Sequence, residues 1–230
     1  MFQGFPPTGI VFLNNLKNNN TKEWFETHRD EYEQTLRLPS KALIEEMAVL
    51  FDEHAMPFEA TLKRSLFRIN RDIRFSKDKS PYKTNIGITF PLFRSSSANS
   101  SSKDRPGMYV HIEPHACFIA GGLYMPDAKQ LRSIRERIDH EWMTLHTIIH
   151  DEEFLHAFPK GLQGAKLKTM PRGFFNDHPG KDLLRLQQMY VMSELSQDLI
   201  LNEQFTHILL AKANIMEPFL VFLEEALVKG

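Results

Sequence analysis

The residues most able to do chemistry form one dense cationic segment, from Arg68 to Lys83. Arginine suits the forked recognition of phosphate or carboxylate groups, and lysine supplies further point charges. So many cations in so short a stretch repel one another unless an anionic ligand or nearby carboxylates lie between them. The candidate ligand-binding residues of this segment are Arg68, Arg71, Asp72, Arg74, Lys77, Lys79, Tyr82 and Lys83.

Three interpretations of this segment stay open. In the first, it binds a phosphate-bearing or polycarboxylate small molecule, with Tyr82 as a candidate proton-transfer group. In the second, Asp72, Asp78 and acidic residues of the helices neutralise the arginines, so that the charges only stabilise the fold. In the third, the segment is a noncatalytic surface for nucleic acid or an acidic protein, with Phe67, Phe75 and Tyr82 as stacking groups.

The charge of the whole chain bears on this choice. The chain has 28 Lys and Arg against 29 Asp and Glu, a net charge of -1, whereas residues 63–83 hold eight basic residues and two acidic ones. An acidic body with one basic segment favours a local anion site, because a nucleic-acid surface usually belongs to a basic domain. We therefore expect an anionic small molecule as the partner, rather than nucleic acid.

Two other stretches carry candidates for the same site. Gly121 and Gly122 follow an expected strand and precede an expected helix, a geometry that can cradle an anion, but we prefer the alternative of a turn that needs glycine for the path of the chain. Lys168 and Arg172 lie in a loop-rich stretch that also holds His178, the one histidine that suits a general acid or base. The alternative for His178 is a place in a helix-entry sequence before a proline.

A metal site is a separate question. His111, Glu113 and His115 alternate along one expected strand, so their side chains could point to one side, as metal ligands must. Pro114 interrupts the run and an exposed strand face carries polar residues without any metal, so we predict no metal site. Cys117 lies in an apolar strand and indicates a core residue rather than a nucleophile. The sequence identifies no cofactor and does not decide whether the protein is an enzyme.

The elements that position these residues indicate an α+β fold, with an antiparallel β-meander in the middle of the chain packed against N- and C-terminal helices. Apolar residues recur three and four positions apart at both ends of the chain, and short β-favouring runs occupy the middle. Asn20 is the expected cap of the first helix, and Pro218 the expected interruption of the last. We predict helices over about 21–35, 39–56, 126–149 and 202–228, and strands over about 86–90, 108–112 and 116–120.

We expect residues 1–230 to form a single domain, because one core can grow to this size and no Pro- and Gly-rich linker marks a boundary. Six of the eight residues from Ser95 to Ser102 are serine, which predicts a flexible loop over about 94–106. A single cysteine, no secretory signal and no apolar run of membrane-spanning length together predict a cytoplasmic protein without a membrane segment. The oligomeric state cannot be predicted from these features.

Taken together, the residues resemble a known family. The match covers nearly the whole chain, with similar stretches at 19–25, 121–126 and 168–179. The most specific part is Arg-x-x-Arg-Asp-x-Arg-Phe followed by Lys and Tyr, present here as Arg68, Arg71, Asp72, Arg74, Phe75, Lys79 and Tyr82. This pattern is similar to that of the bacterial family called domain of unknown function 2461, which also has fungal members. The resemblance implies a single-domain bacterial protein and draws attention to the basic segment, but it implies no activity.

Overall fold

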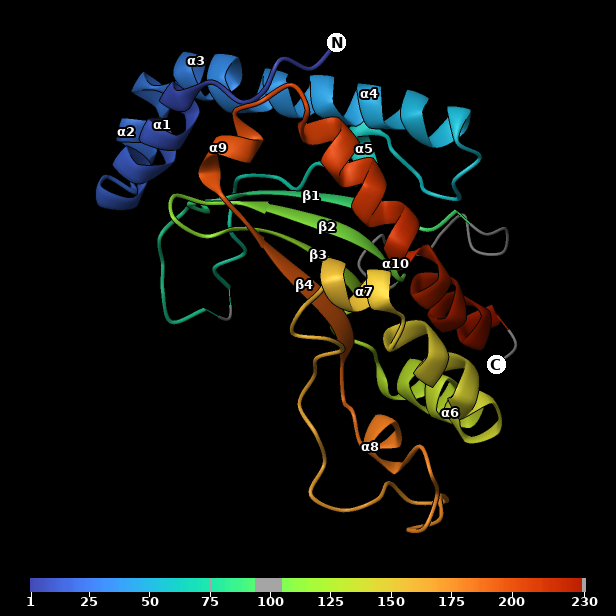
Figure 1. Cartoon of the computed structure of the whole chain (residues 1–230). Coiled ribbons are helices and arrows are strands. Elements are labelled where there is room, and N and C mark those ends of the chain that lie inside the picture. Colours follow the sequence, from blue (N-terminus) through green and yellow to red (C-terminus); the bar gives the residue numbers. More distant parts are fainter. Residues whose placement is uncertain (75, 94–104, 229–230) are drawn as a thin grey trace. The chain divides into compact units, whose positions relative to one another are not determined.

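The computed structural model describes residues 1–74, 76–93 and 105–228. Helices precede and follow a four-stranded antiparallel sheet along the chain, which confirms the predicted α+β class (Figure 1). Phe75 and almost all of the predicted Ser-rich loop lie outside the described residues. The strands pair in the order β1-β2-β3-β4 and are β1 (Ile86–Pro91), β2 (Gly107–Ile112), β3 (Cys117–Leu123) and β4 (Met189–Leu195).

The chain divides into two compact units. Each unit is assembled from three separate stretches of sequence, so the chain passes between the units several times and no single linker separates them. The expectation of a single domain over residues 1–230 stays a prediction. Unit 1 comprises Met1–Phe90, Tyr109–Ile119 and Glu194–Leu210, and unit 2 comprises Pro91–Met108, Ala120–Ser193 and Ala211–Gly230.

N-terminal helices form much of unit 1. Thr21, and not Asn20, caps the helix that follows, because the Thr21 side chain accepts a hydrogen bond from the backbone N–H of Trp24 at 3.2 Å. The predicted helix over 39–56 is α4 (Leu38–Glu53), which begins at Leu38 with Pro39 in its first turn. A π-helical turn ends at Arg37 just before it, and Pro39 has no N–H to donate to the carbonyl of Thr35 in an α-helical hydrogen bond. The helices of unit 1 are α1 (Pro7–Asn18), α2 (Lys22–Thr27), α3 (Arg29–Tyr32), η1 (Glu33–Arg37), α4 (Leu38–Glu53), α5 (Leu62–Ser65) and α9 (Gln197–Ile200).

Aromatic rings fill the core of unit 1. Phe12 and Phe25 are almost completely buried, with ring centroids 6.2 Å apart. Phe25 also stacks on Tyr82 at 4.0 Å, which brings the end of the cationic segment into the same core. Rings of this size contribute a large share of the apolar area that folding buries. The core of unit 1 therefore holds the C-terminal end of the basic segment in place through Tyr82.

Unit 2 is organised around α6 (Ala128–Ile149), which contacts α7 (Glu152–Ala157) and α8 (Lys181–Leu184). A capping box begins α6: Asp127 accepts from the backbone N–H of Gln130 at 2.8 Å, and Gln130 accepts from that of Asp127 at 3.0 Å. The predicted helix over 126–149 is confirmed to within two residues.

The last helix, α10 (Phe205–Val228), begins in unit 1 and continues in unit 2. The expectation that Pro218 interrupts it was wrong, because Pro218 lies inside the helix. Among the described residues, α10 is the one helix long and apolar enough to cross a membrane, and 44% of its most apolar window is buried in the protein. Leu209, Met216 and Phe219 are fully buried, as in the core helix of a soluble protein. Its length and composition are therefore weak evidence for a membrane span.

Candidate functional site

The cationic segment lies in an irregular hairpin of unit 1, residues 66–88, which we call the basic hairpin (teal in Figure 1). Antiparallel bridges pair Leu66 with Ile88 and Asn70 with Tyr82. Three residues lie between these bridges on the first arm and five on the second, so the second arm bulges over 83–87. The tip of the hairpin runs from Arg71, whose backbone N–H donates to the carbonyl of Pro81, to Pro81.

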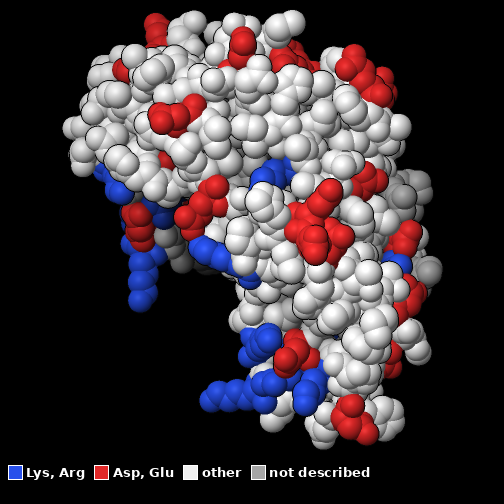
Figure 2. Space-filling view, viewed as in Figure 1, with Lys and Arg blue, Asp and Glu red and all other residues white. Residues whose placement is uncertain are grey.

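Both aspartates of the hairpin tip pair with its arginines. Arg74 contacts Asp72 through two hydrogen bonds of 2.9 and 2.7 Å, and Arg71 pairs with Asp78. Asp78 also accepts from the Ser80 hydroxyl at 2.6 Å and from the Ser80 backbone N–H at 2.9 Å. Hydrogen bonds from Arg74 lower the pKa of Asp72, and those from Ser80, followed by Arg71, lower the pKa of Asp78. Figure 2 accordingly shows red side chains among the blue ones at this hairpin.

The other cations of the hairpin do not all have such partners. The side chains of Arg68 and Lys77 are exposed and form neither a direct ion pair nor a hydrogen bond with another described residue, although the charge of Arg68 helps to lower the pKa of Asp72. The Lys79 ammonium donates to the carbonyl of Ile73 at 2.9 Å, and that of Lys83 donates to the carbonyl of Arg68 at 2.7 Å. A carbonyl oxygen orients an ammonium without neutralising its charge. The hairpin therefore keeps a net positive charge, most openly at Arg68 and Lys77.

Tyr82 has a packing role in unit 1. Its ring is 4% exposed and stacks on Phe25, and Asn20 brackets its backbone with two hydrogen bonds of 3.0 Å. Burial raises the pKa of the Tyr82 phenol. A buried phenol that stays protonated fits the core, and the contacts that the structure describes for this side chain do not support proton transfer.

A hydrogen-bonded chain of three side chains lies along β2, in unit 1. The Tyr109 hydroxyl is 3.1 Å from Nδ1 of His111, and Nε2 of His111 is 3.2 Å from Oε2 of Glu113. An ionised carboxylate only accepts, so Nε2–H donates to Glu113 and Nδ1 accepts from the phenol. Burial raises the pKa of Tyr109 to about 12, which keeps the phenol a donor. We call Tyr109, His111 and Glu113 the polar chain; it can hold or pass a proton.

The bulge of the basic hairpin contacts the polar chain. The Thr84 hydroxyl donates to Oε1 of Glu113 at 3.3 Å, and the Asn85 amide nitrogen is 3.4 Å from Nδ1 of His111. A side chain at Gly87 would have no room, because an added Cβ would lie 2.8 Å from the Tyr109 hydroxyl. Tyr109 was not among the predicted site residues, although Tyr109, His111 and Glu113 follow one another at intervals of two, a spacing that places side chains on one side of a strand.

The three metal-ligand candidates do not come together. His115 is exposed in the turn after β2 with a φ of 65°, whereas His111 and Glu113 contact each other. Within the described part of the chain, no group of three or more His, Cys, Asp or Glu side chains could hold a metal ion.

Gly121 and Gly122 lie inside β3, and not in the connection to the next helix where we expected them. A Cβ on Gly121 would lie 2.4 Å from the sulfur of Met216, and one on Gly122 would lie 2.2 Å from the carbonyl oxygen of Met189. Gly122 also has a φ of 135°, which side chains rarely allow. These contacts, all within unit 2, explain both glycines by close packing and strand pairing. The N-terminus of α6 is already capped by Asp127.

Lys168 and Arg172 are exposed in a long loop of unit 2, residues 162–188. Two other arginines fix this loop: Arg185 donates to the carbonyls of Leu167 and Lys168, and Arg135 of α6 donates to the carbonyls of Leu184 and Leu186. These bonds are 2.7 to 3.1 Å long. Figure 2 shows the basic side chains of this region gathered around α8.

His178 also fixes this loop. Its Nε2 is 3.1 Å from the carbonyl oxygen of Asp139 on α6, and its Nδ1 accepts from the backbone N–H of Gly180 at 2.9 Å. Both ring nitrogens are therefore engaged, with Nε2 as the donor. This arrangement accounts for His178 by its structural contacts, and its predicted acid–base role remains a prediction without support from them.

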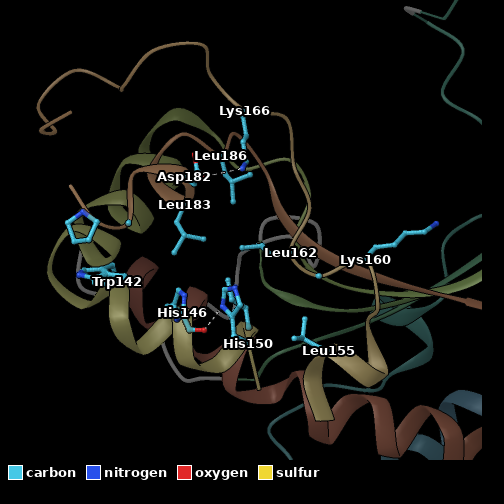
Figure 3. Close-up of a pocket in the computed structure, with 14 residues that line it drawn as sticks. Trp142, His146, His150, Leu155, Lys160, Leu162, Lys166, Asp182, Leu183 and Leu186 are labelled. Atoms are coloured by element: carbon cyan, nitrogen blue, oxygen red, sulfur yellow. Dashed lines mark hydrogen bonds and ion pairs between the residues drawn. The ribbon is translucent and has the colours of Figure 1, made fainter. Parts of the chain in front are cut away.

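A pocket of about 420 Å³ lies between α6 and the 162–188 loop in unit 2, and we call it the α6 pocket (Figure 3). This pocket was not predicted from the sequence. Three aromatic rings at intervals of four, from α6 and the residue that follows it, were a readable signal, but the opposite wall comes from residues far along the chain. The side chains that line it include Trp142, His146, His150, Lys166, Asp182 and Leu183.

The candidate residues thus divide between the two units. The candidates from Arg68 to Lys83 lie in unit 1, whereas Gly121, Gly122, Lys168, Arg172 and His178 lie in unit 2. A family model described as conserved hypothetical protein (DUF2461) matches residues 8–222, a stretch that includes every candidate. No curated protein and no solved structure matches the chain.

Proposed function

The chain belongs to the family of conserved hypothetical proteins DUF2461, and we propose that it is a bacterial cytoplasmic protein that binds a phosphate-bearing or other anionic small molecule at the basic hairpin. One observation carries this proposal. Arg68 and Lys77 are exposed cations whose side chains form no direct ion pair with a described residue, on a hairpin whose two carboxylates already contact other cations. An oxyanion would supply the charge that these cations lack.

The paired arginines remain available to a ligand. The side chains of Asp72 and Asp78 are 43% and 55% exposed, and exposed ion pairs contribute little net stability. A phosphate group carries more charge than one carboxylate and can accept the same forked hydrogen bonds. Arg71 and Arg74 can therefore exchange an aspartate for a ligand at small cost. In the free protein, the two aspartates keep these guanidinium groups apart and oriented.

The polar chain favours acid–base catalysis as a second candidate function of unit 1. The carboxylate of Glu113 orients His111, and the other nitrogen of His111 contacts the Tyr109 hydroxyl. Carboxylate, imidazole and hydroxyl in this order can move a proton to or from a bound molecule. The Thr84 and Asn85 contacts link this chain to the bulge of the basic hairpin. A bound anion whose protonation changes would be the expected substrate.

A thermal-shift screen of inorganic phosphate, pyrophosphate and phosphorylated metabolites tests the binding proposal, because a ligand that binds only the folded protein raises its melting temperature. We expect at least one of these anions to stabilise the wild type. The stabilisation should be lost in an Arg68→Ala, Lys77→Ala double variant and kept in Lys17→Ala, which removes an exposed lysine of α1 in the same unit. Absence of any shift, or an equal shift in all three proteins, would contradict the proposal.

A further inference from the structure

A column of rings forms one wall of the α6 pocket. Trp142 and His146 lie on α6, and His150 directly follows its last residue. The three are four residues apart, so their side chains stand one above the other on one face. The Trp142 and His146 ring centroids are 5.8 Å apart in an edge-to-face arrangement, and those of His146 and His150 are 4.0 Å apart and stacked. Figure 3 shows that both imidazole rings border the cavity. This wall offers ring surfaces to a bound molecule.

Aliphatic side chains face this column across the cavity. Leu162, Leu183 and Leu186 line the pocket from the 162–188 loop (Figure 3). Rings on one side and leucines on the other favour a flat, apolar body over a polar or bulky one. The volume of about 420 Å³ lies within the usual range of small-molecule pockets, roughly 300–1,000 Å³.

The charges near the cavity favour an acidic ligand. Lys166 is 3.9 Å from Asp182, and both side chains are at least half exposed. The same aspartate is 3.8 Å from Arg185, so it is shared by two cations. A long, exposed and shared ion pair leaves the Lys166 ammonium able to bind another anion.

The wall formed by the loop is held in place before any ligand binds. Arg135 and His178 tie the loop to α6 through main-chain groups. Gly180 lies so close to α6 that an added Cβ would be 2.8 Å from the Cβ of Trp142. A preformed wall lowers the ordering cost of binding a small molecule.

We propose that the α6 pocket is a second binding site, for a planar aromatic molecule that carries one acidic group. The ring of the ligand lies against the His146 and His150 imidazoles, and its acidic group contacts Lys166. This site belongs to unit 2 and does not depend on anion binding at the basic hairpin of unit 1.

Three matched probes test the proposal: benzoate, cyclohexanecarboxylate without the aromatic ring, and benzamide without the charge. The ring resonances of histidine-labelled protein are followed by NMR during each titration at constant pH. We expect benzoate to shift His146 and His150 in a saturable, one-to-one manner while His54, an exposed histidine of unit 1, stays unchanged. The other two probes should bind several-fold more weakly, because each lacks one of the two contacts.

Two lysine variants locate the acidic group. Lys166→Ala should weaken benzoate binding roughly fivefold, the size expected for one exposed charge contact. Lys168→Ala is the matched control: it removes an exposed lysine of the same loop that does not line the pocket, and its affinity should equal that of the wild type. The histidine spectra without ligand report whether each variant is folded. Shifts that do not saturate, equal affinity for all three probes, or equal affinity of both variants would each overturn the proposal.

Discussion

The basic hairpin and the 162–188 loop are both rich in Arg and Lys, but their cations contact different groups. In the hairpin, Arg71 and Arg74 pair with exposed aspartates a few residues away, and the Arg68 side chain forms no direct ion pair with a described residue. In the loop and on the adjacent helix, Arg185 and Arg135 donate to main-chain carbonyls. The two regions thus have a similar density of basic residues and differ in the groups that these residues contact. Exposed carboxylates leave the hairpin cations available to a ligand, whereas main-chain carbonyls commit the arginines of the loop region to a structural role.

The two kinds of contact also differ in what they contribute to stability. Burial lowers the pKa of Arg135, because its charge is partly removed from water. Two carbonyl groups compensate for this cost, and they would lose their donor if the arginine were replaced. The exposed ion pairs of the hairpin involve no comparable cost of removing a charge from water, and breaking them changes stability little. We therefore expect substitutions in the loop region to affect folding, and substitutions in the hairpin to affect binding.

The largest expected effect on stability is that of Arg135→Ala. The carbonyl groups of Leu184 and Leu186, two buried residues, would lose their donor, and we expect a loss of about 2 kcal/mol in the free energy of unfolding. Chemical denaturation measures this. Arg132→Ala is the control on the same helix, since Arg132 is exposed and its one ion pair among the described residues is with Glu136, one turn away. If the two variants were equally stable, the clamp in unit 2 would not exist.

His178→Ala should have a smaller effect on the same region. It removes the contacts to the Asp139 carbonyl and to the Gly180 N–H, and we expect it to cost about 1 kcal/mol. His140→Ala, an exposed histidine next to Asp139, should leave stability unchanged. Urea denaturation of both variants decides the matter. Unchanged stability of His178→Ala would reopen the acid–base role that the sequence suggested.

Arg71→Ala tests whether the ion pairs of the hairpin contribute to stability. Its ion pair with Asp78 is exposed, so we expect the melting temperature to change by no more than about 2 °C. Scanning calorimetry measures this shift. A loss comparable with that of Arg135→Ala would mean that the hairpin is a structural ion-pair network, as one interpretation of the sequence held.

The smallest expected effect is that of acid on the hairpin. The pKa values of Asp72 and Asp78 in the folded protein lie below their ordinary value of 3.8, so their contribution is complete above that pH and is lost as the pH falls through the lowered values. The hairpin should therefore keep both ion pairs at pH 5. Carboxyl carbon shifts in an NMR titration report each pKa. A pKa at or above 3.8 for either aspartate would show that its carboxylate does not form the ion pair described here.

Local pattern was enough to predict most of the fold. In β2, Met108, Val110 and Ile112 alternate with less buried residues, and this two-residue period was readable. The same period is weaker in β4, where only Met189 and Val191 are buried and the second half contains Ser193 and the exposed Glu194. That strand depends on its partner β3, a long-range pairing that local sequence patterns do not contain. The local pattern therefore predicted no element over 189–195.

The candidate site could be predicted in composition but not in geometry. The cations of the hairpin were evident, yet their pairing depends on the tip and on the bulge that directs Thr84 and Asn85 toward Glu113 and His111. Neither feature has a strong local signature. The α6 pocket needs two walls that are distant in sequence, so the spacing of rings on α6 alone could not reveal it. Side chains with clear local periodicity were predicted, and contacts between distant segments were not.

The most direct test of the central claim is the affinity of the hairpin for inorganic pyrophosphate, measured by calorimetry on the wild type, Arg68→Ala and Asp78→Asn. Arg68→Ala removes an unpaired cation, and Asp78→Asn removes a carboxylate that competes with the ligand for Arg71. We predict saturable binding to the wild type, binding about tenfold weaker to Arg68→Ala, and tighter binding to Asp78→Asn. Equal affinity in all three proteins, or no binding to any of them, would contradict the assignment of the basic hairpin as an anion site.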